Sequence, residues 1–282
     1  MFPLQLLGFD VDVVNSVHFS NHTGFEKGWE GDVLQGDQLR AIMQGLERNG
    51  LLTDVGHLLT GYIGSASFLG AIVDVIKTLR QRPDGKKLRY VCDPVLGDVG
   101  SGFYVPRELV QLFREQVVPE ADVVTPNQFE AEQLTGLSIN SVQDVVMACK
   151  SLHELGPSLV VITSVRLETG EKDIISIYAS RHVRAKETTE LWCIKCPELP
   201  GRYTGTGDLL SSLLLGHSAM NPDDLPGSLE MVMNTMYATI KRSLELSPDI
   251  PLDSTHSRGL HLIQCKQIIE DPPREFKAYL VH

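Results

Sequence analysis

The chain has 282 residues, of which 42% are apolar and 22% are charged, and this composition is typical of a folded globular protein. Its formal net charge of -11 argues against nucleic-acid binding, because recognition of a nucleic-acid backbone needs a basic face. The charge does not exclude a nucleotide, since backbone amides, a helix N-terminus and a metal ion supply a local positive field. The length favours one large α/β domain over residues 1–282.

The cysteines favour a reducing compartment. All five are scattered along the chain. Cys193 and Cys196 have the spacing of a metal or redox pair, but no second pair follows, and the flanking Trp192 and Ile194 indicate a strand. Neither a signal peptide nor an apolar run of the roughly 20 residues that span a bilayer is recognised. We therefore expect a soluble protein of the cytosol with no membrane partner.

The first two thirds of the chain have the rhythm of parallel βαβ units, because short apolar runs bounded by turn residues alternate with helical patterns. The pattern predicts strands over Phe9–Val17, His57–Leu59, Leu88–Cys92, Asp122–Val124 and Leu159–Ile162. It predicts helices over Asp37–Arg48, Ser65–Arg80, Arg107–Val117 and Asn127–Leu134.

The pattern changes in the last third. Asp173–Ala179 and Glu190–Ile194 are two β runs without a helix between them, which predicts an antiparallel hairpin at the sheet edge. Helices are predicted over Gly207–Ser218 and Gly227–Leu244. Ser247–Arg258, rich in Pro, Asp and Ser, predicts a surface loop before two closing segments, Leu260–Ile263 and Phe276–Val281.

Small or polar residues end four of the predicted strands. Ligands of open α/β sheets bind outside the carboxyl ends of the strands, so these residues are expected to share one rim. The rim is the candidate site, and its pairs are Thr60-Gly61, Asp93-Pro94, Thr125-Pro126 and Thr163-Ser164.

A glycine-rich turn precedes the apolar helix near residue 210. In Gly205-Thr206-Gly207-Asp208, two glycines let several backbone amides point at one spot, and the helix dipole adds positive charge there, which predicts an anion hole. Asp208 is placed to accept the proton of a hydroxyl that attacks a bound γ-phosphate. An ordinary turn with an aspartate helix cap has the same sequence.

Two acidic motifs also lie at the rim. Asn127 and Glu130 share one helical face, where they can hold the water shell of Mg²⁺ or simply cap the helix. Asp93 and Asp98 flank a turn that contains glycine. Two acids beside a phosphate need an intervening cation, although a polar surface turn looks the same.

These motifs together resemble pyridoxal kinase, in the ribokinase-like superfamily. They occur in the family's order over nearly the whole chain: Asn15 to Gly24, Leu59 to Tyr62, Asp93 to Asp98, Thr125 to Glu130, Val161 to Ser164 and Gly205 to Asp208. The resemblance implies a three-layer α/β/α sandwich with a mostly parallel central sheet, usually a homodimer. It also implies transfer of the γ-phosphate of ATP to the 5′-hydroxyl of pyridoxal, pyridoxine or pyridoxamine.

The resemblance also implies a role for each matching residue. Asp208 is the catalytic base and touches the substrate, and Thr23 and Tyr62 contact the vitamer. The anion hole is formed by Gly205, Thr206 and Gly207. ATP-binding positions are Asp93, Asn127, Glu130, Thr163, Ser164 and Thr206, with Leu199, Pro200 and Gly201 on the adenine side. Asp98 is associated with Mg²⁺ or another divalent cation such as Zn²⁺. A monovalent cation, K⁺ or Na⁺, is assigned to Asp93, Thr125, Glu130 and Thr163.

The start of the chain departs from the family. Met1–Gly8 resembles the end of the family's first helix running into its second strand, so the first strand and its glycine-rich turn have no counterpart. A shortened isoform, an error in the assigned start or a degenerate copy fits this departure. We expect little kinase activity until such a segment is restored. The alternatives are a hydroxymethylpyrimidine or sugar kinase, and a non-catalytic shortened paralogue that binds vitamer or a partner subunit.

Overall fold

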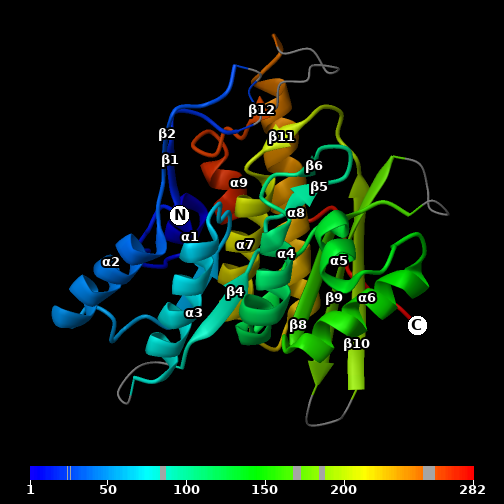
Figure 1. The fold of residues 1–282 in the computed structure, drawn as a ribbon. Helices are drawn as coiled ribbons and strands as arrows, with labels where there is room; N and C mark the ends of the chain where they lie inside the picture. Colours follow the sequence, from blue (N-terminus) through cyan, green and yellow to red (C-terminus); the bar gives the residue numbers. More distant parts are fainter. Residues whose placement is uncertain (24, 26, 83–86, 168–172, 184–187, 250–257) are drawn as a thin grey trace.

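The computed structural model describes residues 1–282 apart from 24, 26, 83–86, 168–172, 184–187 and 250–257 (Figure 1). Its main sheet has the strand order β13-β10-β9-β8-β7-β4-β3. The first four of these strands along the chain run parallel: β3 (His57–Thr60), β4 (Arg89–Cys92), β7 (Val123–Val124) and β8 (Leu159–Val165). The others pair antiparallel: β9 (Ile174–Val183), β10 (Thr188–Pro197) and β13 (Tyr279–Leu280).

Helices cover both faces of this sheet (Figure 1). One face carries α2 (Gly36–Arg48), α3 (Ala66–Arg80), α4 (Glu108–Leu112), α5 (Gln128–Thr135) and α6 (Val142–Leu155). The other carries α1 (Phe2–Leu6), α7 (Thr206–Met220), α8 (Leu225–Glu245) and α9 (Lys266–Glu270). The predicted helix over Arg107–Val117 is divided, because α4 passes into a π-helical turn (Phe113–Val117) and a 3₁₀ turn (Val118–Glu120).

Alternation along the central strands produces the layers. In β4, Tyr90 and Cys92 join the apolar cluster under α2–α6, while Val91 between them joins the cluster under α7 and α8. In β7, Val124 and Val123 divide in the same way. Successive side chains of a strand point to opposite faces, so a strand that is apolar throughout needs cover on both sides. The predicted three-layer α/β/α sandwich is confirmed.

In the described part of the chain, three small sheets lie outside the main one: β1 (Val17–Phe19) with β2 (Gly31–Val33), β5 (Gly97–Asp98) with β6 (Gly102–Phe103), and β11 (Tyr203–Thr204) with β12 (Arg258–Gly259). The predicted strand over Phe9–Val17 is wrong, because among the described residues the segment 9–16 has no strand partner. The apolar side chains of Phe9 and Val11 instead pack as coil against the α7–α8 cluster. Their alternation reflects burial without a hydrogen-bonded ladder.

The second half holds two further corrections. The predicted hairpin is confirmed as β9 and β10, but it is not the edge of the described sheet, because β13 pairs with the outer side of β10. Most of the predicted loop Ser247–Arg258 lies outside the described residues. Arg258 itself is buried, because its backbone joins Tyr203 in the β11–β12 pair and carries the side chain inward.

Helix α6 was not predicted. Ser141 caps it, and the side chains of Ser141 and Asp144 exchange hydrogen bonds with each other's backbone N–H groups. Val145, Ala148, Cys149 and Leu152 form its buried stripe, and the helix ends at Gly156. The sequence contains a signal that could have predicted this helix. A serine stands three residues before an acid, apolar residues follow at helical spacing, and a glycine ends the run.

Candidate active site

The carboxyl ends of the four parallel strands meet at one rim, as predicted. The backbone ladder continues into it, because the Asp93 N–H donates to the Thr60 carbonyl at 2.9 Å and the Thr125 N–H to the Cys92 carbonyl at 3.0 Å. The Thr163 N–H donates to the Pro126 carbonyl at 2.8 Å, which places β8 level with β7. The side chains of Thr60, Asp93, Thr125 and Thr163 are all buried. Polar groups are thus concentrated at or close to the carboxyl ends of the four parallel strands.

Asp93 is the most perturbed acid of the rim. Burial raises its pKa well above the ordinary value, and the neighbouring charges of Glu130 and Asp208 raise it further, while a hydrogen bond from Thr125 acts in the opposite direction. Carboxylates that lie this close together in a poorly solvated site need a proton or a cation between them. The cluster is therefore a place where positive charge is favoured.

Glu130 holds two backbone segments together. One carboxylate oxygen accepts the Leu96 N–H at 2.9 Å, and the other accepts the Asn127 N–H at 2.8 Å. Asn127 completes the cap of α5 and donates its amide to the Gly97 carbonyl at 2.7 Å. Burial nevertheless raises the pKa of Glu130 to about 7. The capping alternative thus describes this motif in the structure. Glu130 Oε1 also accepts the Gly97 N–H at 3.4 Å, so only Oε2 keeps a lone pair for a further ligand.

Asp98 lies in the short β5–β6 hairpin beside this turn. Its carboxylate accepts the Val99 N–H at 2.7 Å, and its charge contributes to the raised pKa of Glu130. Phe103 of β6 packs edge to face on Phe129 of α5, with ring centroids 5.1 Å apart. The hairpin is therefore anchored to α5, and Asp98 is held near Glu130.

Asp208 reaches the rim from the first turn of α7. Gly205, the residue before the helix, has a left-handed backbone with φ of 88°, a conformation that favours glycine. Asp208 is accessible to solvent, yet partial burial raises the pKa of its carboxyl group, opposed by the positive charge of the chain's amino group. Because the free N–H groups of a first helical turn point outward along the axis, Gly205, Thr206 and Gly207 can surround an anion there.

The two predicted vitamer contacts differ in their support. Tyr62 is partly buried and follows Gly61, and its carbonyl accepts the hydroxyl of Ser16 at 2.5 Å, which ties the segment before β1 to the rim. Thr23 is exposed in the loop between β1 and β2. Within the described interactions, no contact joins Thr23 to another predicted site residue.

The predicted adenine side forms an open hollow of about 450 Å³, lined by Leu199, Pro200 and Gly201 together with Asp173 and Glu198. The Tyr203 hydroxyl donates to the Pro200 carbonyl at 2.8 Å. Gly201 has φ of 98°, and a side chain there would overlap the guanidinium of Arg258. Glycine is thus required at position 201 by the close approach of the buried Arg258, which was predicted to lie in a surface loop.

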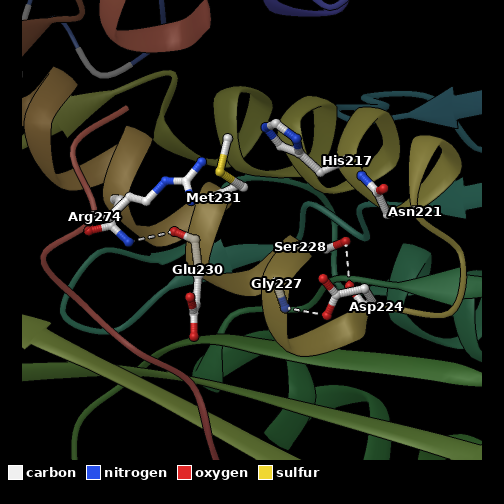
Figure 2. A pocket seen from close by; sticks show the side chains of 9 residues that line it. His217, Asn221, Asp224, Gly227, Ser228, Glu230, Met231 and Arg274 are labelled. Atoms are coloured by element: carbon white, nitrogen blue, oxygen red, sulfur yellow. Dashed lines mark hydrogen bonds between the residues drawn. The ribbon is translucent and has the colours of Figure 1, made fainter. Parts of the chain in front are cut away.

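A second cavity, of about 270 Å³, lies between the end of α7 and the start of α8 (Figure 2). His217 lines it from α7, Asn221 lines it from the position directly after that helix, and Arg274 lines it from the chain after α9. It contains none of the predicted site residues and lies at the opposite end of α7 from Asp208. The cavity is therefore separate from the candidate active site.

The cysteines do not form a chemical centre. All five are free and buried. Cys193 packs in the apolar cluster under α2–α6, and Cys196 packs in the cluster under α7 and α8, so the sheet separates the two thiols.

Among the described residues, no group of three histidine, cysteine or acidic side chains could by itself hold a metal ion. Within the same part of the chain, no helix has the length and apolar character needed to cross a membrane.

Residues 41–250 match the model of a family described as phosphomethylpyrimidine kinase. A pyridoxal kinase of Arabidopsis thaliana is 47% identical over 99% of this chain and 87% of its own length. A pyridoxal kinase of Sus scrofa is 39% identical over 96% of this chain and 86% of its own. The solved structure of pyridoxal kinase from Leishmania donovani, in complex with ADP and pyridoxamine, has a TM-score of 0.90 and 29% identity, covering 100% of this chain and 92% of that one.

These likenesses cover the sheet, both helical layers and the rim. The family model begins within α2 and ends beyond α8, so it includes the four strand ends that form the rim. The predicted resemblance is confirmed, and the chain belongs to the pyridoxal kinase family of the ribokinase-like superfamily.

Proposed function

We propose that residues 1–282 act as one kinase domain that transfers the γ-phosphate of ATP to the 5′-hydroxyl of pyridoxal, pyridoxine or pyridoxamine. The observation that carries this proposal is Asp208, which stands in the first turn of α7 beside the buried acid Asp93 in a chain 47% identical to a pyridoxal kinase. Asp208 accepts the proton of the 5′-hydroxyl, whose oxygen forms a bond to the γ-phosphorus as the bond to the leaving ADP oxygen breaks. The backbone of Gly205, Thr206 and Gly207 stabilises the negative charge of the transferred group.

The nucleotide is proposed to lie along the rim, with its phosphates toward Asp208 and its adenine in the hollow beside Leu199–Gly201. ADP in the complex of the Leishmania protein supports a nucleotide site in this fold. The remaining contacts are assigned to residues at the strand ends and helix starts: Asp93, Asn127, Glu130, Thr163, Ser164 and Thr206.

Cations are assigned to the acidic part of the rim, although the described protein side chains alone do not form a metal site there. The raised pKa values of Asp93 and Glu130 support this assignment, because a buried carboxylate is stabilised by a proton or by a nearby cation. We assign Asp98 to a divalent cation, Mg²⁺ or Zn²⁺, which supplies neutralisation of phosphate charge when bound. A monovalent cation, K⁺ or Na⁺, is assigned to Asp93, Thr125, Glu130 and Thr163. Phosphate and water oxygens would complete both sets of ligands.

The remaining assignments follow the family resemblance. Thr23 and Tyr62 contact the vitamer, and two copies of the chain form a homodimer. Five free thiols support a location in the cytosol.

A second candidate function is phosphorylation of a hydroxymethylpyrimidine, which the description of the matching family favours. Both acceptors present a hydroxymethyl group on a nitrogen heterocycle, so the same base and anion hole serve either one. Selection between them depends on the pocket wall near Tyr62.

The test is ADP formation by the purified chain with each acceptor in turn: pyridoxal, pyridoxine, pyridoxamine, hydroxymethylpyrimidine and ribose. The proposal expects turnover with the three vitamers, in contrast to the little activity expected from the departure at the start of the chain, and it expects loss of that turnover in Asp208→Asn. Preference for hydroxymethylpyrimidine would establish the second candidate. Vitamer binding in calorimetry without turnover of any acceptor would instead support the non-catalytic alternative.

A further inference from the structure

Arg166 directly follows β8, whose pairing with β9 becomes irregular near the rim. The register of β8 against β9 shifts between Ile162 and Val165, and Ser164 within that shift has a left-handed φ of 55°. The Arg166 N–H donates to the side-chain oxygen of Gln128 in α5 at 2.8 Å, and its guanidinium donates to the Ser164 carbonyl at 3.2 Å. The guanidinium is thus held beside Ser164, the last residue of the predicted phosphate-binding set on this strand.

Glu198, which lines the hollow beside Leu199, pairs with this guanidinium. Its carboxylate accepts Arg166 Nε at 3.0 Å and Arg166 Nη2 at 2.5 Å, so the two side chains meet through two parallel hydrogen bonds. Glu198 follows β10 and directly precedes Leu199, and its own N–H donates to the Asp173 carbonyl at 2.7 Å. The ion pair therefore joins the phosphate side of the proposed nucleotide site to its adenine side.

The exposure of this ion pair allows a phosphate to take the place of Glu198. Asp93, Asp98 and Glu130 make the rim acidic, so a bound phosphate needs a positive charge beside it, and Arg166 lies close enough for the charge of Asp98 to act on it. A guanidinium presents its N–H groups in a planar fork that fits a phosphate as well as a carboxylate. Both side chains keep much of their surface exposed, 44% for Arg166 and 37% for Glu198, so the ion pair itself contributes little stability. A more highly charged phosphate can therefore replace Glu198 at small cost.

We propose that Arg166 binds the phosphates of the nucleotide and that Glu198 holds its guanidinium while the site is empty. Arg166 is then a positioning and affinity residue, and Glu198 is a competitor for the same guanidinium. This inference rests on the proposed function, because it takes ATP as the nucleotide of the rim. It predicts opposite effects for the two partners of one ion pair, whereas a purely structural ion pair predicts effects of the same sign.

The test is the dissociation constant of ADP, ATP and adenosine, measured by calorimetry for the wild-type chain, Arg166→Gln and Glu198→Gln. Arg166→Gln is expected to weaken ADP and ATP binding on the order of 10-fold, the usual effect of losing one charge-assisted hydrogen-bonding group. Adenosine, which lacks phosphate, should bind both variants and the wild type alike. Glu198→Gln should tighten ADP and ATP binding, and Arg166→Lys should restore part of the affinity lost in Arg166→Gln.

The matched control is the pair Arg181 and Glu190, which face each other across β9 and β10 with Nη2 and Oε2 3.2 Å apart. Arg181→Gln and Glu190→Gln remove an ion pair of similar exposure and should leave all three dissociation constants unchanged. Thermal unfolding of every variant shows whether it is folded at the temperature of measurement.

Each contrary result is distinct. If Arg166→Gln and Glu198→Gln both weaken ADP, the pair is a structural contact and the inference is wrong; unchanged constants in both overturn it as well. If the wild-type chain binds neither ADP nor ATP, the proposed function fails together with the inference. If it binds ADP with the predicted opposite shifts but phosphorylates no acceptor, only the proposed catalysis fails.

Discussion

Asp208 lies against Gly61, although one residue begins α7 and the other follows β3. A Cβ added to Gly61 would stand 3.3 Å from Asp208 Oδ1, which is closer than an ordinary van der Waals contact. A Cβ added to Gly207 would stand 3.5 Å from Asp93 Oδ2, which is an ordinary van der Waals contact. The missing side chain of Gly61 therefore lets the proposed base lie directly against the end of β3, while the first turn of α7 packs against Asp93 after β4.

We expect Gly61→Ala to lower turnover on the order of 10-fold with little change in ADP affinity. The new methyl group displaces the Asp208 carboxylate by a few tenths of an ångström, and misplacement by about 1 Å can cost on the order of 100-fold. The measurement is kcat for pyridoxal beside the dissociation constant of ADP. Gly70→Ala is the matched control, because Gly70 lies within α3 and a methyl group added there would meet no atom within 4 Å. Equal kcat in the two variants would contradict the contact.

Asp208→Asn should reduce turnover by about 100-fold or more, because an amide cannot accept the proton of the 5′-hydroxyl. ADP binding should remain close to wild type, since the base acts mainly in the transition state. The raised pKa of Asp208 also predicts that wild-type turnover declines toward acidic pH at a higher pH than for an ordinary aspartate. Near-full turnover in Asp208→Asn would remove this residue from the mechanism.

Removal of divalent cations should abolish phosphoryl transfer, because Asp93, Asp98 and Glu130 would otherwise meet the phosphates as bare negative charges. The measurement is turnover in excess chelator, followed by addition of Mg²⁺ to the same sample. Recovery on addition separates cation dependence from unfolding. Transfer that persists in chelator would contradict the role assigned to these acids.

The layers of the fold were predictable because local patterns determine them. Strands with apolar residues at successive positions need helices on both faces, and polar strand ends in such a sheet converge on one edge. The Gly205–Asp208 turn is also explained by local structure. Gly205 has a left-handed backbone that favours glycine, and Asp208 lies in the first turn of a helix, where an acid is favoured. These features were therefore visible in the sequence before any contact between distant residues was known.

The features that were missed depend on partners far away in the chain. Arg166 and Glu198 are 32 positions apart, and neither spacing nor residue type indicates that they pair. Arg258 has a long, charged side chain, yet it is buried because Gly201 leaves room for its guanidinium. Phe9 and Val11 alternate like a strand, but side-chain alternation reports burial and does not report whether the backbone has a partner.

His217 carries a buried nitrogen in the second cavity (Figure 2). Its side chain is buried and its Nε2 makes no hydrogen bond within the described residues. Burial lowers the pKa of the ring below the ordinary value of 6.5. The folded chain therefore keeps this ring neutral at a pH where the unfolded chain takes up a proton. Protonation of His217 in the unfolded chain has no effect on the free energy of unfolding well above pH 6.5, and it lowers that free energy as the pH falls below 6.5.

His217→Leu is expected to raise the free energy of unfolding by about 1 kcal/mol at pH 7.5, because it removes an unsatisfied buried polar group. The gain should be larger at pH 5.5, since the variant also loses the proton uptake of the unfolded histidine. His153→Leu is the matched control. The pKa of His153 is also lowered by burial, but its ring nitrogens contact the Pro157 carbonyl at 2.8 Å and the Ser180 hydroxyl at 2.9 Å, so the variant should be less stable than wild type at pH 7.5. Urea unfolding at both pH values measures the differences. A His217→Leu variant that is less stable than wild type at pH 5.5 would show that the ring is hydrogen-bonded or charged in the folded protein.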